Sequence, residues 1–211
     1  MSALRRRRPP YKLLSVLLQY PDEALVEALP AIADAIAALP SPWRRPLTRF
    51  HGHLAATPPV ALRQAYVETF DLQRRASLYL TYFTHGDTRR RGMALLALKR
   101  RYAAAGLVLA AGELPDYLPL MLEFAALAPS GAGEPVLADH RAGLELLRLA
   151  LRERGSPYAD VLDAVCAGLP SPAREELETV RRLAVEGPPT EQVGLQPFAP
   201  PEVMPGMEAR T

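Results

Sequence analysis

The chain has 211 residues, 49% of them hydrophobic and 23% charged, which gives enough apolar material for one buried core and excludes a largely disordered protein. Its 25 Lys and Arg residues nearly balance 23 Asp and Glu residues, and four of the bases form the run at residues 5–8. The remaining chain is close to neutral, which disfavours a nucleic-acid-binding domain with a basic face. The single cysteine, Cys166, excludes an intramolecular disulfide, and we expect it to be an inert core residue in a reducing compartment.

The N-terminal segment, MSALRRRRPPYKLLSVLLQYPDE, has the basic start of an export signal but not the rest of one. Its apolar stretch covers only residues 13–18, no small-residue cleavage site follows, and Asp22 and Glu23 come directly after. No other segment approaches the roughly 20 apolar residues that cross a bilayer. We therefore expect a cytoplasmic protein with no stable membrane insertion and a basic tail over residues 1–10.

Proline and glycine divide the remainder into helices, because Ser-Pro and Thr-Pro pairs start helices and glycine ends them. Leu, Val and Ala recur at helical spacing between these marks, and no stretch alternates as a strand does. We predict an all-α single globular domain of about eight to ten helices over residues 11–186, with flexible termini. The predicted helices cover residues 11–20, 22–39 (with a break at Pro30), 42–56, 58–70, 87–105, 116–128, 135–154, 157–167 and 172–186.

Two segments fall outside this helical pattern. Residues 129–135 (PSGAGEP) predict a loop between two parts of the domain. Residues 187–211 carry six prolines without periodicity, which is typical of a flexible tail.

Catalytic and metal-binding signatures are absent from the sequence. There is no phosphate-binding loop, nucleophile elbow, HExxH or CxxC motif. His51 and His53 are two residues apart, so on a helix they point to different faces and cannot share a metal. We expect no enzymatic activity, no cofactor and no metal.

The segment 66–124 is unusual because it holds eight of the thirteen Tyr and Phe residues. Tyr79, Tyr82 and Phe83 have helical spacing, and we assign Phe83 to the core. For Tyr79 and Tyr82 the sequence leaves two readings open, a core stripe or the edge of a groove that uses the apolar ring and polar tip of tyrosine.

Charged residues accompany these aromatic residues. Asp87 is predicted to be a helix N-cap, and the three arginines that follow it oppose the helix dipole, at up to ~1 kcal/mol each. Solvation of the exposed arginines can offset this unfavourable energy. Alternatively, Arg91 and its neighbours can pair with carboxylates such as Asp71 or Glu68, or with a partner protein. Further on, Glu113 and Asp116 flank Pro115 at a helix start. They either cap that helix or form an acidic lip for a basic peptide.

Four blocks in this segment resemble the respiratory nitrate reductase assembly chaperones, also called the delta subunit or NarJ family, within the redox-enzyme maturation chaperones. The blocks are residues 66–71 (YVETFD), 77–82 (SLYLTY), 86–92 (GDTRRRG) and 113–119 (ELPDYLP). The resemblance covers about residues 11–186 and omits the basic run and the Pro-rich tail.

The resemblance implies an all-helical chaperone that binds the molybdenum-bearing alpha subunit of nitrate reductase, including a basic N-terminal segment. It implies that the alpha subunit stays in the cytoplasm until the molybdenum cofactor is inserted, and that cofactor-delivery proteins are further partners. The residues that we assign to partner-peptide binding are Asp71, Tyr79, Tyr82, Asp87, Arg91, Glu113, Pro115, Asp116 and Tyr117.

Within this set the tyrosines are expected to form the floor or edge of a groove, with Asp71, Glu113 and Asp116 as charges on its edge. Arg91 is the exception, since it can instead organise the acidic side internally. Two alternative functions are a chaperone for another molybdenum enzyme and a helical nucleic-acid-binding protein that uses the basic residues at 5–8, 89–91 and 99–101.

Overall fold

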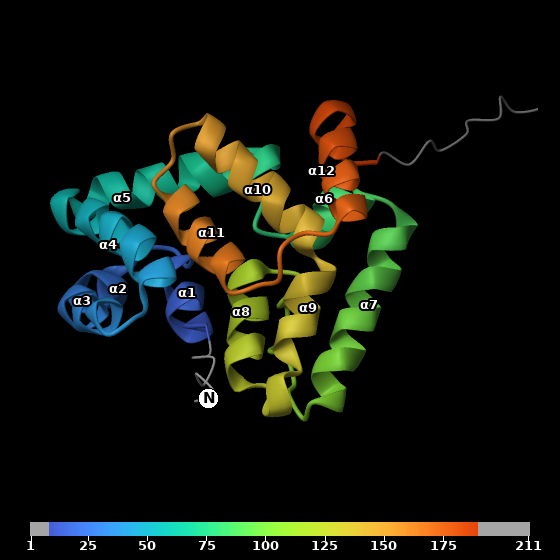
Figure 1. Cartoon of the computed structure of the whole chain (residues 1–211), viewed down its shortest axis with the longest axis horizontal. Coiled ribbons are helices and arrows are strands. Elements are labelled where there is room, and N and C mark those ends of the chain that lie inside the picture. Colours follow the sequence, from blue (N-terminus) through green and yellow to red (C-terminus); the bar gives the residue numbers. More distant parts are fainter. Residues whose placement is uncertain (1–8, 190–211) are drawn as a thin grey trace, which may run out of the picture.

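The computed structural model describes residues 9–189 and shows a single domain in which those residues form twelve α-helices and no strand (Figure 1). This confirms the predicted all-α class, with two helices more than the upper expected number. The helices are α1 (Tyr11–Leu17), α2 (Glu23–Glu27), α3 (Leu29–Ala37), α4 (Ser41–Ala56), α5 (Pro59–Tyr66), α6 (Leu80–His85), α7 (Arg89–Ala104), α8 (Leu118–Leu127), α9 (Gly133–Asp139), α10 (Arg141–Glu153), α11 (Tyr158–Ala167) and α12 (Arg174–Glu186).

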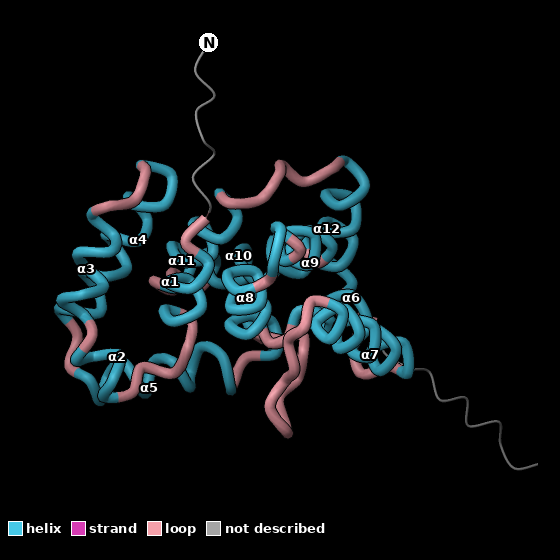
Figure 2. Tube along the Cα trace, turned by 90° about the horizontal axis from the view of Figure 1, so that it is seen from below, coloured by secondary structure: helices cyan, strands magenta, loops and turns pink. Residues whose placement is uncertain are grey.

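The core lies where α1, α8, α10 and α11 meet. α1 packs on α8, α11 packs on α4, and α10 contacts α6, α11 and α12. Leu14, Leu122 and Leu144 are fully buried there, and so is Phe50 of the neighbouring α4. Figure 2 shows the pair α3 and α4 at one end of the domain and α7 at the other, so the segment 66–124 runs from the middle of the molecule to one end.

The helix predicted over residues 22–39 is two helices, and the break falls before Pro30. The side chain of Asp22 caps α2 by accepting a hydrogen bond from the backbone N–H of Leu25 at 2.9 Å. Ala28 separates α2 from α3, and Pro30 occupies the first turn of α3. Proline is tolerated in a first turn because the N–H that it lacks has no partner within the helix.

The helix predicted over residues 135–154 also divides, at His140, and α9 starts inside the predicted loop 129–135. Gly133 opens α9 directly against α8: a Cβ placed there would lie 2.1 Å from the Cα of Ala125. This close packing turns the predicted loop into a short 3₁₀ turn followed by helix. Packing against another helix is not visible in local propensity, which explains the error.

The segment between α5 and α8 differs most from the sequence-based expectation. A π-helical turn, Val67–Asp71, follows α5, and the short helix α6 was not predicted. The prediction that Asp87 is an N-cap was wrong, because α7 begins at Arg89 and Thr88 precedes it. Likewise, α8 begins at Leu118 rather than at Asp116.

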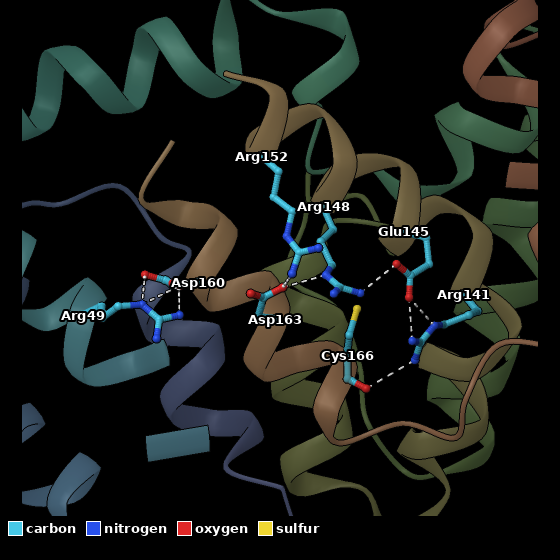
Figure 3. Close-up of polar contacts among 8 residues, drawn as sticks. All are labelled: Arg49, Arg141, Glu145, Arg148, Arg152, Asp160, Asp163 and Cys166. Atoms are coloured by element: carbon cyan, nitrogen blue, oxygen red, sulfur yellow. Dashed lines mark hydrogen bonds and ion pairs between the residues drawn. The ribbon is translucent and has the colours of Figure 1, made fainter. Parts of the chain in front are cut away.

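A network of charged side chains, the α10–α11 network, joins α10 to α11 (Figure 3). Its members are Arg141, Glu145, Arg148, Arg152 and Asp163. Arg141 is 5% exposed, pairs with Glu145 at 2.6 Å, and donates to the backbone oxygen of Pro170 at 3.1 Å. Arg148 bridges Glu145 (3.0 Å) and Asp163 (2.6 Å).

Cys166 lies beside the α10–α11 network (Figure 3). It is buried, as predicted, and burial raises the pKa of its thiol to about 11. The thiol is therefore almost entirely protonated near neutral pH, so it is a poor nucleophile.

The predicted terminal tails fall mostly outside the described residues: only residues 9 and 10 of the first tail and 187–189 of the second are described. Within residues 9–189, no helix has the length and apolar character needed to cross a membrane.

Candidate functional site

The first part of the site is the π-helical turn after α5. It turns Phe70 inward onto the rings of Tyr66 and Tyr158, with centroids 4.8 Å from each. Asp71, the next residue, is exposed at the surface. π-helical turns are uncommon and are frequent at functional sites.

The second part is a crossing of two distant segments at Tyr79 and Tyr117. The backbone N–H of Leu80 donates to the oxygen of Asp116 at 3.0 Å, and that of Leu118 donates to the oxygen of Leu78 at 2.8 Å. These bonds form an isolated antiparallel bridge that places the two tyrosine rings 5.4 Å apart, centroid to centroid. Tyr79 is 38% exposed, so it belongs to the surface and not to a core stripe.

A surface recess of about 340 Å³ lies beside this crossing, and we call it the tyrosine recess. It contains five of the nine residues that were predicted from the sequence. Its lining consists of Phe70, Asp71, Gln73, Arg74, Ser77, Tyr79, Tyr82, Asp87 and Arg91.

A cluster of polar side chains, which we call the Arg91 cluster, lies along one side of the tyrosine recess. Its members are Thr81, Asp87, Arg91 and Asp116. The guanidinium of Arg91 lies 3.6 Å from Asp116 and 3.4 Å from Asp87, and its Nε donates to the Thr81 hydroxyl at 3.3 Å. It also lies 6.0 Å from the centroid of the Tyr82 ring, within cation–π range. Arg91 therefore organises the acidic side internally, which was the second of its two predicted roles.

Asp116 is not a charge on the edge of the groove, and that part of the prediction was wrong. Its side chain is fully buried, and one carboxylate oxygen accepts hydrogen bonds from the hydroxyl and backbone N–H of Thr81. The other oxygen has no hydrogen-bond partner within residues 9–189. Nor does Asp116 cap α8, since no side-chain cap bond starts that helix. The carboxylate acts through Arg91, by holding it against Tyr82.

The remaining predicted residues belong to a neighbouring surface. Glu113 and Tyr117 line a second recess of about 450 Å³, the α8 recess, whose other walls include Tyr102, Val108 and Leu127. Pro115 is buried below this surface, and its backbone oxygen accepts a hydrogen bond from the Tyr102 hydroxyl at 2.7 Å. The Tyr79–Tyr117 pair joins the two recesses.

The charge of the tyrosine recess is mixed rather than purely acidic. Asp71 and Asp87 are exposed, while Arg91 is occupied by its two carboxylates. Arg74 also lines the recess, and it has no ion-pair partner within residues 9–189. Burial raises the pKa of Tyr79, and the negative charges of Asp116, Glu113 and Asp71 add to the shift, so its hydroxyl stays protonated and able to donate.

Sequence reasoning missed Arg74 and Thr81. Arg74 lies just after a block of the resemblance and has no neighbour in the sequence that marks it. Thr81 lies inside a block, but its role depends on Asp116, which is 35 residues away. Within residues 9–189, no group of three or more His, Cys, Asp or Glu side chains is placed to hold a metal ion.

Comparison with known proteins relates most of the chain to one family. The protein-family model described as nitrate reductase delta subunit matches residues 22–164 of this chain. The nitrate reductase-like protein NarX of Mycobacterium tuberculosis H37Rv is 39% identical over 156 residues, which is 74% of this chain and 24% of NarX. The chain thus spans about a quarter of the length of that relative.

Two relatives named as nitrate reductase molybdenum cofactor assembly chaperone NarJ match at 38% identity. The match to the Bacillus subtilis protein covers 77% of this chain and 89% of that protein. The match to the Escherichia coli K12 protein covers 72% of this chain and 65% of that protein. A solved structure from Archaeoglobus fulgidus, described as a redox enzyme maturation protein, has a TM-score of 0.58 and 24% identity over 80% of this chain and 95% of that one. This likeness shows a shared fold.

Proposed function

Because the chain belongs to the nitrate reductase delta subunit family, we propose that it is an assembly chaperone for the catalytic alpha subunit of a respiratory nitrate reductase. It binds the alpha subunit in the cytoplasm, keeps it open for insertion of the molybdenum cofactor, and has no catalytic role of its own. Support for the family comes from the match over residues 22–164 and from the two NarJ relatives.

Within this function, the tyrosine recess binds a basic N-terminal segment of the alpha subunit. The observation that carries this assignment is the recess itself, which combines two partly exposed tyrosine rings with the carboxylates of Asp71 and Asp87. Aromatic side chains supply much of the affinity of peptide-binding surfaces, and carboxylates attract a basic peptide in a salt-dependent way. Glu113 and Tyr117 extend the same surface into the α8 recess.

Asp116 and Pro115 are positioning residues in this proposal, because both are buried beneath the surface. Asp116 holds Arg91, which lies over the Tyr82 ring, and Pro115 anchors the segment before Tyr117 through the Tyr102 hydroxyl. The peptide therefore meets Tyr79, Tyr82, Asp71 and Asp87 directly, and depends on the buried pair for their placement.

Calorimetric titration of the full chain with a peptide of the alpha-subunit N-terminus tests the proposal. We expect binding that weakens as salt is added, because exposed carboxylates attract the basic segment. No heat and no competition at low salt would contradict the assignment. Titration with the leader peptide of another molybdenum enzyme tests the alternative function. If the chain serves that enzyme instead, its leader peptide should bind more tightly than the nitrate reductase peptide.

Two further partner assignments need their own measurements. Co-purification of the chain with an alpha subunit that lacks its molybdenum cofactor is expected, and cofactor-delivery proteins are expected in the same complex. A nucleic-acid function predicts instead a steep salt dependence of binding to DNA or RNA that requires the arginines at residues 5–8. We expect no such binding.

A further inference from the structure

The helix α7 lies at one end of the domain and packs on it through one side only (Figure 2). That inner side carries its two buried residues, Leu98 and Tyr102, and the Tyr102 ring packs on Phe124 of α8 with centroids 4.3 Å apart. On the outer side, Met93 is 68% exposed and Leu96 is 42% exposed. Neighbouring apolar side chains exposed on one helix often indicate a surface that binds a membrane or another molecule.

Basic residues surround these two apolar side chains. Met93, Leu96 and Arg100 are separated by three and four residues, so they lie along one face of the helix. A helix turns by about 100° per residue, which places Arg90 on one side of this stripe and Lys99 on the other. All five side chains are exposed, and we call them together the outer α7 face.

The charge of this region is of one sign. Residues 89–112 contain six basic residues and no acidic residue. Two of the six are paired with carboxylates that lie outside α7. Arg90, Lys99 and Arg100 have no ion-pair partner within residues 9–189. The outer α7 face is therefore a positive surface that an anionic partner can neutralise.

An anionic lipid bilayer complements both the charge and the apolar side chains of this face. Lipid phosphates attract the bases, while the Met93 and Leu96 side chains can enter the boundary between the headgroups and the acyl chains. Nucleic-acid phosphates would attract the bases but leave the two apolar side chains in water. Protein partners are usually anchored in pockets, and neither the tyrosine recess nor the α8 recess includes any residue of the outer α7 face.

We propose that α7 binds reversibly to the surface of a membrane that contains anionic phospholipid. The helix lies parallel to the surface, with Met93 and Leu96 directed toward the acyl chains and the three bases of the outer α7 face among the lipid phosphates. Each basic residue near such a surface strengthens binding roughly fivefold, so the attachment is weak and depends on salt. It does not depend on the proposed function of the tyrosine recess.

Co-sedimentation of the full chain with lipid vesicles tests the proposal. Vesicles of equal parts phosphatidylglycerol and phosphatidylcholine should bind the chain, with binding that weakens as salt is added, and vesicles of phosphatidylcholine alone should bind it little. Equal binding to both vesicles, or no binding to the anionic vesicles at low salt, would overturn the proposal.

Charge-reversal variants show whether α7 is the part that binds. The double change Arg90→Glu, Arg100→Glu should weaken binding to the anionic vesicles more than tenfold, since two attractive charges become repulsive. The matched control is Arg44→Glu, Arg45→Glu in α4, which makes the same change in net charge at exposed positions at the other end of the domain (Figure 2). Circular dichroism verifies that both remain folded. An equal loss in the two variants would contradict binding through α7.

Apolar variants distinguish a bilayer from nucleic acid. The double change Met93→Ser, Leu96→Ser should weaken vesicle binding several-fold, whereas Val60→Ser, Val185→Ser should not, although these valines are 75% and 86% exposed. If the first pair has no effect on vesicle binding and a DNA duplex binds more tightly than the vesicles, the outer α7 face is a nucleic-acid surface and the proposal fails.

Two further controls separate α7 from the rest of the chain. Replacement of the four arginines at residues 5–8 by serine should leave the effect of Arg90→Glu, Arg100→Glu intact; loss of that effect would assign vesicle binding to residues 5–8 instead. The same α7 variant should bind the alpha-subunit peptide as the unchanged chain does, because neither residue lines the tyrosine recess or the α8 recess. Peptide binding without vesicle binding would therefore contradict the membrane proposal alone.

Discussion

The α10–α11 network and the Arg91 cluster are both built from arginines and carboxylates, yet they differ in how completely the charges are satisfied. In the α10–α11 network each carboxylate contacts two arginines, and the buried Arg141 also binds backbone oxygens (Figure 3). In the Arg91 cluster a fully buried carboxylate keeps one oxygen without a partner within residues 9–189, and its arginine is partly exposed beside a recess. The first arrangement joins α10 to α11 through ion pairs, and the second positions side chains that line the tyrosine recess.

This difference shows why charge alone does not identify a functional site. In a network whose charges are all paired, the ion pairs contribute stability and no charge is left free to bind a ligand. The Arg91 cluster instead holds the position of the Tyr82 ring, which lines the tyrosine recess. We therefore expect changes in the α10–α11 network to affect unfolding only, and changes around Arg91 to affect both unfolding and peptide binding.

The largest effect on stability is expected from Arg141→Ala. The change leaves Glu145 with one arginine fewer and removes the donors to the Cys166 and Pro170 oxygens. Breaking a buried ion pair costs about 3–5 kcal/mol, so chemical denaturation should show a loss of that order. Arg174→Ala, in an exposed pair with Glu178, is the control and should change little. Peptide affinity should be unaffected in both variants that remain folded.

Arg91→Met should cost less stability, about 1–3 kcal/mol, because the remaining carboxylate of Asp116 keeps its Thr81 hydrogen bonds. It should also weaken peptide binding, since Arg91 no longer fixes the Tyr82 ring. The double variant Arg91→Met, Asp116→Asn should regain part of the stability but not the affinity. Recovery of both together would mean that the cluster is only structural.

Tyr79→Ala should have the opposite profile, with little effect on stability. Loss of one aromatic contact at a binding surface costs about 1.4 kcal/mol or more, which corresponds to a roughly tenfold weaker peptide Kd. Tyr20→Ala is the control, because Tyr20 is also partly exposed but lies outside both recesses. Calorimetry and thermal unfolding of the two variants should separate binding from folding, and an equal loss of affinity would count against the recess.

The smallest expected effect is a pH dependence from His140. Burial lowers its pKa below the usual 6.5, although its Nδ1–H donates to the Val136 oxygen at 2.8 Å. The unfolded chain therefore binds the proton more readily, so stability is full above pH 6.5 and falls as pH decreases below it. Thermal unfolding from pH 7.5 to 5.5 should show this decline, and His140→Gln should reduce it. A decline of equal size in His140→Gln would assign it to other groups.

The sequence was sufficient for the features that depend on local pattern. Helical periodicity, together with proline and glycine punctuation, predicts the all-α class and most helix positions. The four motif blocks point to the segment that carries the tyrosine recess. Tyr79 was ambiguous by periodicity, and its exposure follows from the antiparallel bridge to Tyr117, a contact between residues 38 positions apart.

The features that the sequence did not predict depend on contacts between distant segments. Asp116 is buried because Thr81 and Arg91 come from α6 and α7 to meet it. The early start of α9 follows from the fit of Gly133 against Ala125. From the local sequence, Asp116 after Pro115 is expected to be an exposed charge, and Gly133 is expected to belong to a loop. Only their tertiary contacts show that Asp116 is buried and that Gly133 begins a helix.

Hydrogen–deuterium exchange of the full chain with and without the alpha-subunit N-terminal peptide locates the peptide-binding surface. We predict slower exchange on peptide binding around the tyrosine recess, in residues 70–91 and 113–118, and no change in residues 141–163 of the α10–α11 network. Protection confined to residues 141–163, with none around Tyr79 and Tyr82, would contradict it.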